Sequence, residues 1–301
     1  MSGSNAASIS RWKSWFGALP SFPGKVRLID AAATVLQLIG ENERKVCLWE
    51  GAEFWVDLHD RIQRQMWRGC YEPHVMGALR GILRPGDTFV DLGAHIGYHS
   101  YFAAGLVGAS GRVFSFEADP SNFLRLKKNL APFPQAQAEH CAIWSDEENL
   151  MFTRSESLKE SGWGALASVR NAPDREQVEV HGVSLDIWSE RTRLEAIRAI
   201  KIDVEGAELA VLRGAKRILR DMRPVLVLEM SEPLLMQSGA SAAMIEELLR
   251  AHKYRLYRFS EGPLLPWSSV GRDESVDCVA VPEEYATVQG HADRTRNRGR
   301  D

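Results

Sequence analysis

An aspartate, two glycines and a distant glutamate form the most chemically suggestive spacing in the chain. Asp91, Gly93 and Gly97 give the pattern D-x-G-x-x-x-G, and Glu117 follows at the end of the next apolar run. Glycine in a turn lets the backbone approach a ligand without interference from a Cβ atom. A carboxylate at the carboxyl end of a strand in an open α/β sheet can accept hydrogen bonds from both hydroxyls of a ribose. The spacing therefore predicts half of a nucleotide-binding site.

The elements that must position these residues are a strand, a turn, a helix and a second strand. Residues 88–91 are a short apolar run that predicts a buried strand, and residues 97–107 predict a helix. The first amides of this helix point into the turn. Residues 112–116 predict the next strand, which ends at Glu117. A strand-helix-strand unit brings both strand ends to one edge of a parallel sheet.

The glycine spacing also indicates which nucleotide the turn binds. A nicotinamide fingerprint needs glycine two and five positions after Gly93, where this chain has His95 and Tyr98, and the chain has no P-loop. The pattern instead resembles the S-adenosylmethionine (SAM) site of class I methyltransferases. The resemblance implies that Asp91 lies under the methionine end and that Glu117 binds the ribose. The cofactor-binding set it implies is Asp91, Gly93, Ala94, His95, Gly97, Tyr98 and Glu117, with Ala142 and Ile143 beside the adenine.

Three charged residues alternate along a second strand-like run. Lys201, Asp203 and Glu205 share one face if the strand persists, while the aliphatic residues between them take the other. Three charged groups on one face of a central strand are costly unless water reaches the sheet edge there. The pattern therefore predicts a wet, functional edge.

Two segments together narrow the family. DLGAHIGYHS, which begins at Asp91, and KIDVEGAELAVLRGA, which begins at Lys201, resemble the FkbM family of SAM-dependent methyltransferases over residues 71–281. Ala118 stands where that family commonly has proline, and His95 where asparagine is usual. The resemblance implies an α/β fold: a Rossmann-like class I core of about seven mostly parallel strands with helices on both faces. The residues before it predict an N-terminal hairpin and helix extension.

Asp203 is the predicted catalytic base. An alcohol is a poor nucleophile, so methyl transfer to oxygen needs a base for its proton or a metal that acidifies it. In class I methyltransferases the end of the fourth core strand faces the methyl group, which favours Asp203, with Lys201 holding its ionised state. Glu205 is a second base, a substrate anchor or the partner of Lys201 in a structural ion pair. His95 is an alternative base. Mg²⁺ held by Asp203, Glu205 and Glu229 is possible but not favoured, because acidic strand ends occur without metal.

The remaining elements follow from apolar runs and turn residues. A hairpin is expected over residues 45–58, turning at Glu50 and Gly51, and the strands between residues 149 and 183 are expected to be inserted near the rim of the site. The last strand is expected to be antiparallel. Further strands are expected at 138–143, 149–154, 167–170, 177–183, 199–203, 224–229, 255–259 and 276–281, and helices at 72–83, 120–130 and 242–252.

Composition supports one catalytic domain with extensions. The chain has 301 residues, of which 45% are hydrophobic, and a net charge of -3 that gives no overall field for nucleic acid or anionic membrane. We expect an N-terminal extension at 1–70, a methyltransferase domain at 71–284 and a disordered charged tail at 285–301. No apolar run reaches the about 18 residues of a membrane span. Four scattered cysteines without a C-x-x-C pair predict neither zinc nor disulfides, and a reducing cytoplasm is the simplest compartment.

Two aromatic features carry alternatives. Trp12, Trp15, Phe16 and Leu19 recur at roughly helical spacing and are expected to pack on their own domain, with an interfacial membrane anchor or a partner helix as the alternative. Trp163, between two glycines of the insertion, is either a packing anchor or a lid that stacks on a sugar.

The sequence therefore predicts a SAM-dependent O-methyltransferase with a small-molecule or glycan acceptor. The FkbM resemblance implies polyketide-type natural products, sugars or lipid-linked glycans as acceptors. An N-methyltransferase of the same fold is the alternative enzyme and would depend less on Asp203. A SAM-binding partner subunit without turnover is the alternative outside enzymes, and the KIDVEG segment argues against it.

Overall fold

The computed structural model describes residues 43–48, 52–155, 161–162, 164–166, 174–260 and 264–285, together with Arg27, Ala31, Thr34 and Val35. The expected tryptophan-rich segment, the turn at Glu50 and Gly51, the strand at 167–170, Trp163 and the tail from residue 286 lie outside the described residues. The chain divides into two compact units. One comprises Met1–Pro73 with Ser155–Trp163, and the other comprises His74–Arg154 with Gly164–Asp301.

The first unit contains the expected hairpin and a helix. Strands β1 (Glu43–Cys47) and β2 (Glu53–Asp57) pair antiparallel, with Lys45 opposite Trp55. Helix α3 (Arg61–Arg68) begins at Asp60, whose side chain accepts a hydrogen bond from the Gln63 amide at 2.9 Å. An N-cap aspartate satisfies one of the unpaired amides of the first turn. The Asp60 carboxylate also accepts a hydrogen bond from the Ser161 amide at 2.8 Å.

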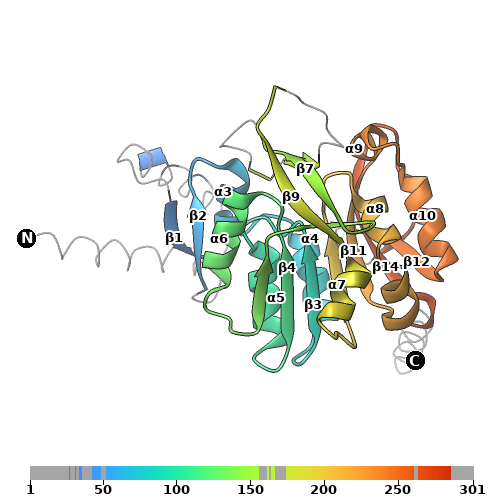
Figure 1. The fold of residues 1–301 in the computed structure, drawn as a ribbon. Helices are drawn as coiled ribbons and strands as arrows, with labels where there is room; N and C mark the ends of the chain where they lie inside the picture. Colours follow the sequence, from blue (N-terminus) through green and yellow to red (C-terminus); the bar gives the residue numbers. More distant parts are fainter. Residues whose placement is uncertain are drawn as a thin grey trace, which may run out of the picture. The chain divides into compact units, whose positions relative to one another are not determined.

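The second unit is built on an eight-stranded sheet with the order β13-β12-β14-β11-β10-β3-β4-β5 (Figure 1). The five strands from β11 to β5 run parallel, and β14 runs antiparallel to both β11 and β12. The expected mostly parallel sheet with an antiparallel last strand is confirmed, and β13 adds a two-residue edge. The strands are β3 (Thr88–Leu92), β4 (Arg112–Phe116), β5 (Ala136–Glu139), β10 (Ala199–Ile202), β11 (Val225–Ser231), β12 (Tyr254–Arg258), β13 (Leu265–Pro266) and β14 (Ser275–Pro282).

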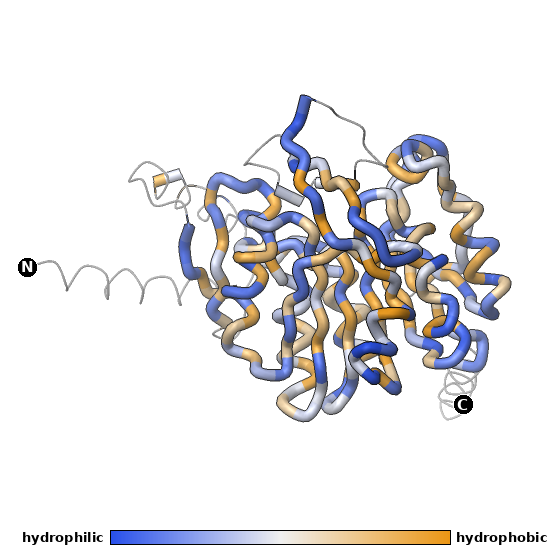
Figure 2. Tube along the Cα trace, viewed as in Figure 1, coloured by the Kyte–Doolittle hydropathy of each residue, from blue (hydrophilic) through white to orange (hydrophobic). Residues whose placement is uncertain are grey.

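Helices cover both faces of this sheet. One face holds a buried cluster in which Phe116 and Ile200 join Trp188, Leu212 and Ile245 of three helices. Hydrophobic residues run along the strands in Figure 2. Because side chains alternate along a strand, the residues between the cluster members face the opposite side, where α5 packs. The helices are α4 (Pro73–Ile82), α5 (Tyr98–Val107), α6 (Pro120–Leu130), α7 (Leu185–Arg191), α8 (Glu208–Arg213), the π-helical turn η1 (Ile218–Met222), α9 (Glu232–Gln237) and α10 (Ala242–Ala251).

The single strand expected at residues 138–143 is wrong. The chain instead forms β5, which ends at Glu139, and β6 (Ala142–Trp144), which belongs to another sheet. Among the described residues β5 is the edge strand of the main sheet, so none of them forms a further strand that would hold the chain in that plane beyond Glu139. The sequence gives no sign of the break, because residues 138–143 contain neither glycine nor proline.

The second sheet has the order β6-β9-β7-β8. β7 (Glu148–Thr153) and β9 (Gln177–Ser184) confirm the strands expected at 149–154 and 177–183. β8 (Ala165–Leu166) lies just before the strand expected at 167–170. Gly214, after α8, lets this sheet approach the main core: a Cβ atom there would lie 2.2 Å from the Trp144 carbonyl oxygen. The insertion is thus packed directly against the segment that follows β10.

Candidate functional site

Asp91, at the end of β3, is a buried carboxylate with one oxygen in a hydrogen-bond chain. Its Oδ2 accepts from Ser100 Oγ at 2.5 Å, and Ser100 Oγ in turn accepts from Ser115 Oγ at 2.8 Å. Its Oδ1 is buried and has no hydrogen-bond partner. Burial raises the pKa of Asp91, and the nearby charge of Lys201 opposes the shift. An unsatisfied carboxylate oxygen in the interior is costly and favours a donor beside it.

Packing and backbone conformation together account for the two glycines of the turn. A Cβ atom on Gly93 would lie 1.8 Å from the carbonyl oxygen of Asp203, and one on Gly97 would lie 2.7 Å from Leu126 Cδ1. Both glycines also have a positive φ, +75° and +90°. The close approach of Gly93 to Asp203 brings the turn after β3 against the loop after β10.

The residues between the glycines link the turn to β4. His95 has a φ of +53°, in the left-handed region where asparagine is the more common non-glycine residue. The His95 amide donates to Glu117 Oε2 at 2.8 Å, and the Ala94 amide donates to the Phe116 carbonyl at 2.9 Å. Tyr98 is buried at the start of α5. The structure therefore brings Glu117 together with the turn.

Glu117 is a buried acid held by backbone amides. Besides the His95 amide it accepts from the Asp119 amide at 2.8 Å. Burial raises the pKa of Glu117 to about 7, although these two hydrogen bonds act in the opposite direction. Glu117 therefore changes charge in the neutral range.

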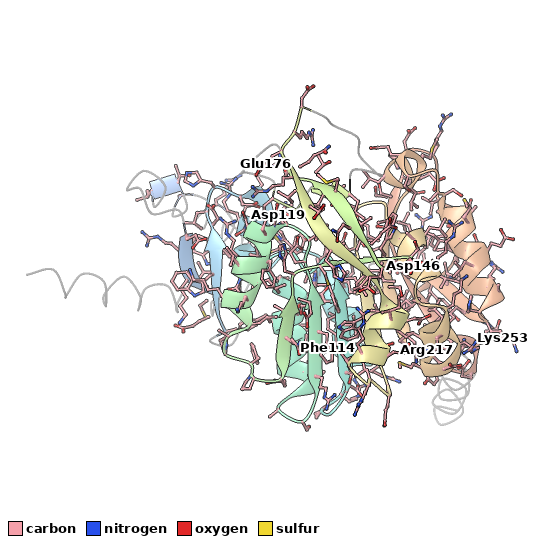
Figure 3. The ribbon with its side chains drawn as sticks, in the orientation of Figure 1. Phe114, Asp119, Asp146, Glu176, Arg217 and Lys253 are labelled. Carbon is pink, nitrogen blue, oxygen red and sulfur yellow. The ribbon has the colours of Figure 1, made fainter. Side chains whose placement is uncertain are left out.

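Arg154 ties the inserted sheet to the loop that carries Glu117. Its guanidinium donates to Asp119 at 2.8 Å and to Glu176 at 2.9 Å, and both acids are labelled in Figure 3. It also donates to Ser121 Oγ at 2.7 Å. The end of β7 is thereby fixed to the N-terminus of α6.

Ala142 and Ile143 both lie on β6, in the small sheet. Ile143 packs in the main core with Phe116, whereas Ala142 packs on the other side with Phe152 and Ala207. The two side chains thus point in opposite directions, and only one of them shares the environment of the inserted sheet.

Lys201 of β10 and Asp203, which directly follows this strand, form an ion pair with a buried lysine. Lys201 is 4% exposed and its Nζ donates to Asp203 Oδ2 at 2.7 Å. Lys201 is also the direct cross-strand partner of Asp91. The strand does not persist to Glu205, which has a φ of +53° in the loop after Ile202. Glu205 therefore does not continue the strand face of Lys201 and Asp203.

Other acids around Asp203 escaped the sequence reasoning. Glu208 accepts from the amides of Gly206 and Val204 at 3.0 and 3.3 Å, and burial raises its pKa to about 7. Asp277 of β14 lies 2.6 Å from His74 of α4. The position of Glu208, two residues after Gly206, could have been read from the sequence as a cap for the loop. Asp277 has no such signal, because only the sheet register brings it to this edge.

Within the described part of the chain, no group of three or more His, Cys, Asp and Glu side chains is arranged to hold a metal ion. None of the helices described is long and apolar enough to cross a membrane.

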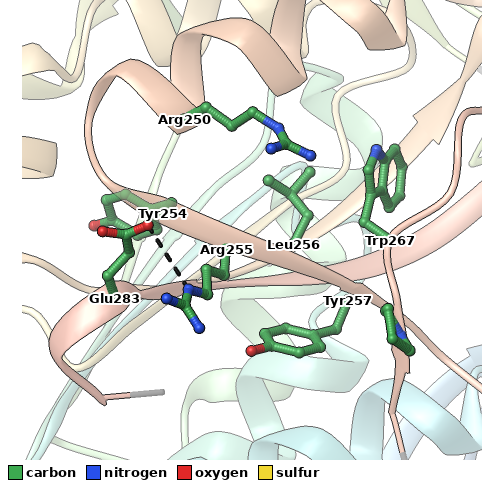
Figure 4. A pocket seen from close by; sticks show the side chains of 8 residues that line it. Arg250, Tyr254, Arg255, Leu256, Tyr257, Trp267 and Glu283 are labelled. Carbon is green, nitrogen blue, oxygen red and sulfur yellow. Dashed lines mark ion pairs between the residues drawn. The ribbon is translucent and has the colours of Figure 1, made fainter. Parts of the chain in front are cut away.

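A cavity of about 420 Å³ lies at the opposite end of the main sheet from β5, beside β12 and β13 (Figure 4). Figure 4 shows Arg255 directed at Glu283, an ion pair of 3.7 Å. No predicted site residue lines this cavity, so it is separate from the site above. Its lining residues are Arg250, Tyr254, Arg255, Leu256, Tyr257, Pro266, Trp267 and Glu283.

Residues 91–256, more than half of the chain, match the model of the methyltransferase FkbM domain. The chain belongs to the FkbM methyltransferase family. The matched region is a SAM-dependent methyltransferase domain with the class I fold, as both motifs suggested.

Individual relatives are more distant. Methyltransferase 1 from Beauveria bassiana (strain ARSEF 2860) is 29% identical over 148 residues, which cover 43% of this chain and 59% of the relative. The chain thus spans about three fifths of that relative. Among solved structures, a SAM-dependent O-methyltransferase from Thermotoga maritima is 11% identical with a TM-score of 0.40, covering 79% of this chain and 77% of that one. TYW2 from M. jannaschii in complex with AdoMet is 10% identical with a TM-score of 0.39, covering 80% and 84%.

Gly93→Ala should destabilise the protein by about 2–5 kcal/mol, because a methyl group meets the Asp203 carbonyl and a left-handed conformation must be kept. Gly105→Ala is the matched control: Gly105 lies exposed inside α5 with open space around it, and alanine there should add about 0.5–1 kcal/mol. Urea unfolding measures both. Equal stability of Gly93→Ala and the unmodified protein would show that the two loops do not touch.

Proposed function

We propose that the protein is an O-methyltransferase that moves the methyl group of SAM to a hydroxyl of a small molecule or glycan. The observation that carries the proposal is an ion pair just beyond β10, in which a buried lysine holds a carboxylate whose backbone contacts the glycine turn. Asp203 accepts from Lys201 at 2.7 Å, and its carbonyl lies against Gly93. A base next to a cofactor turn suits proton removal from an acceptor hydroxyl.

The cofactor half of the proposal rests on the donor and acceptor groups of the turn. Asp91 Oδ1, buried without a partner, suits the ammonium group of the methionine moiety. Glu117 retains lone pairs beyond the two amides it accepts from, and these suit the ribose hydroxyls. We assign the backbone of the turn to binding the rest of the methionine moiety of SAM, and β6 to contacting its adenine ring. The residues assigned in this way are Gly93, Ala94, His95, Gly97 and Tyr98, and Ala142 and Ile143.

SAM supplies the methyl group on a sulfonium whose thioether is a good leaving group. The protein must therefore align the acceptor and take up one proton. Asp203 would take the hydroxyl proton of the acceptor as its oxygen receives the methyl group, and the thioether would leave as S-adenosylhomocysteine. Lys201 keeps Asp203 ionised beforehand, and Glu205, in the adjoining loop, anchors the acceptor or acts as a second base.

We propose the same domain division that the sequence predicts. The boundary between the compact units at Pro73 and His74 supports a methyltransferase domain from about residue 71, and the docking of the inserted sheet through Arg154 supports an acceptor-side role for residues 149–183.

Cys47, Cys70, Cys141 and Cys278 are all free, which supports a reducing cytoplasm as the compartment.

Glu117→Gln should weaken S-adenosylhomocysteine binding about 10- to 100-fold above pH 7, because hydrogen bonds to a charged carboxylate are lost. The pKa of Glu117 is raised to about 7 by burial. The unmodified protein should therefore bind S-adenosylhomocysteine more weakly as the pH falls below 7 and the Glu117 carboxylate becomes protonated. Glu117→Gln should lack this dependence, whereas Glu195→Gln, at an exposed position, should retain it. Calorimetry above and below pH 7 measures the affinity of each variant and its pH dependence. Unchanged affinity in Glu117→Gln would remove the ribose assignment.

Asp203→Asn should lower kcat about 10²- to 10⁴-fold with little change in SAM affinity, because the amide keeps the shape but cannot accept the proton. Glu205→Gln should cost less. Formation of S-adenosylhomocysteine is measured with acceptors found by mass-spectrometric screening of extract with the purified protein. Full activity of Asp203→Asn at saturating acceptor would reject the base. Loss of activity with EDTA and its return with Mg²⁺ would make the acids metal ligands.

A further inference from the structure

A row of three carboxylic acids crosses the sheet at Asp203. Ile202 of β10 pairs with Leu228 of β11, so the next residues of these parallel strands, Asp203 and Glu229, are neighbours. Glu229 is also the direct partner of Asp277 on antiparallel β14. Like charges on adjacent positions of neighbouring strands destabilise a sheet. The three acids therefore cannot all be ionised without compensation.

The outer acids of this row have basic partners and the middle one does not. Lys201 donates to Asp203 at 2.7 Å, and His74 lies 2.6 Å from Asp277. Among the ion pairs of the described residues, none involves Glu229. Its side chain instead shares a hydrogen bond with Asp203. Glu229 is thus the acid with the least support for a negative charge.

The groups that act on Glu229 come from each neighbouring element. Asp203 of β10, Asp277 of β14 and Glu205 of the loop after β10 all place negative charge near it. The cationic and titratable groups act on its neighbours instead. His99 of α5 acts on Asp203, His74 of α4 acts on Asp277, and Lys201 of β10 acts on both.

The balance of charges decides which acid holds the proton. The charge of Asp203, and then burial, raise the pKa of Glu229 well above its usual range. Burial opposes the ionisation of Asp203, but the charge of Lys201 and the hydrogen bond from Glu229 outweigh it and lower the pKa of Asp203. Two hydrogen-bonded carboxyl groups share a proton because the doubly ionised pair repels itself.

We propose that Glu229 is a positioning residue that stays protonated and donates a hydrogen bond to the catalytic carboxylate of Asp203. The inference rests on the proposed function in one respect, the role of Asp203 as base. Lys201 and Glu229 together hold that carboxylate in one orientation, as proton transfer to it requires. The proton from the acceptor hydroxyl brings the pair from one proton to two. One proton then returns to solvent, so Glu229 is not consumed.

The kinetic test compares two replacements of Glu229. Glu229→Gln keeps a neutral donor and should hold kcat within about threefold, whereas Glu229→Met fills similar space without a donor and should lower kcat about 10- to 100-fold. The KM for SAM should change in neither. An equal loss in both variants would show that the negative charge of Glu229 is needed and would overturn the proposal.

A second test reads the proton without using activity. A glutamate in the unfolded chain ionises at about pH 4.3. If Glu229 stays protonated in the native state, the chain takes up a proton at Glu229 when it folds above that pH. Stability from this group is complete below that pH and declines as the pH rises. The urea midpoint of the unmodified protein should therefore fall relative to that of Glu229→Gln between about pH 5 and pH 9.

The control for this second test is Glu195→Gln, which makes the same substitution at an exposed position outside the row of acids and should not reproduce this fall. A pH-independent difference in Glu229→Gln would overturn the proposal, because Glu229 would then be ionised in the native protein. The midpoints also separate two failures. If Asp203→Asn is fully active while the midpoint of the unmodified protein still falls relative to that of Glu229→Gln, the base assignment fails and the protonated Glu229 remains.

Discussion

The packing of Gly93 against the backbone of Asp203 is the constraint on which the site depends. A methyl group on Gly93 would overlap the Asp203 carbonyl, and the Asp203 amide donates to the Leu92 carbonyl at 3.1 Å. The loops after β3 and β10 are therefore held together through both the amide and the carbonyl group of Asp203. Because the backbone groups are in contact, the side chains of Asp91 and Asp203 lie along one edge of the sheet without any need for a ligand to gather them.

The electrostatics of this edge depend on Lys201. It is the only lysine or arginine among the fully buried residues described in the second unit, and it lies beside both Asp91 and Asp203. Burying several acids around one cation leaves most of them with raised pKa values, as found for Asp91, Glu229 and Asp277. Asp203, in direct contact with Lys201, is the exception. A charge removed from water is stable only when it is paired, so the lysine determines which of these acids stays ionised.

The strands, caps and glycine turn could be predicted because each has a local signal. β4 and α6 occur as expected, since an apolar run ends at an acid and Pro120 follows a capping Asp119. The division into β5 and β6 could not be predicted, because it depends on β5 being the edge strand of the main sheet as far as the described residues show. Asp277 reaches the site only through antiparallel pairing with β11, a contact between residues far apart in sequence.

A structure of the protein with S-adenosylhomocysteine tests the central claim most directly. The account predicts the ribose hydroxyls on Glu117, the amino group on Asp91 Oδ1, and the sulfur on the side of Asp203 and Glu229. Binding of the ligand in the cavity beside β12 and β13, or with its ribose away from Glu117, would contradict the account.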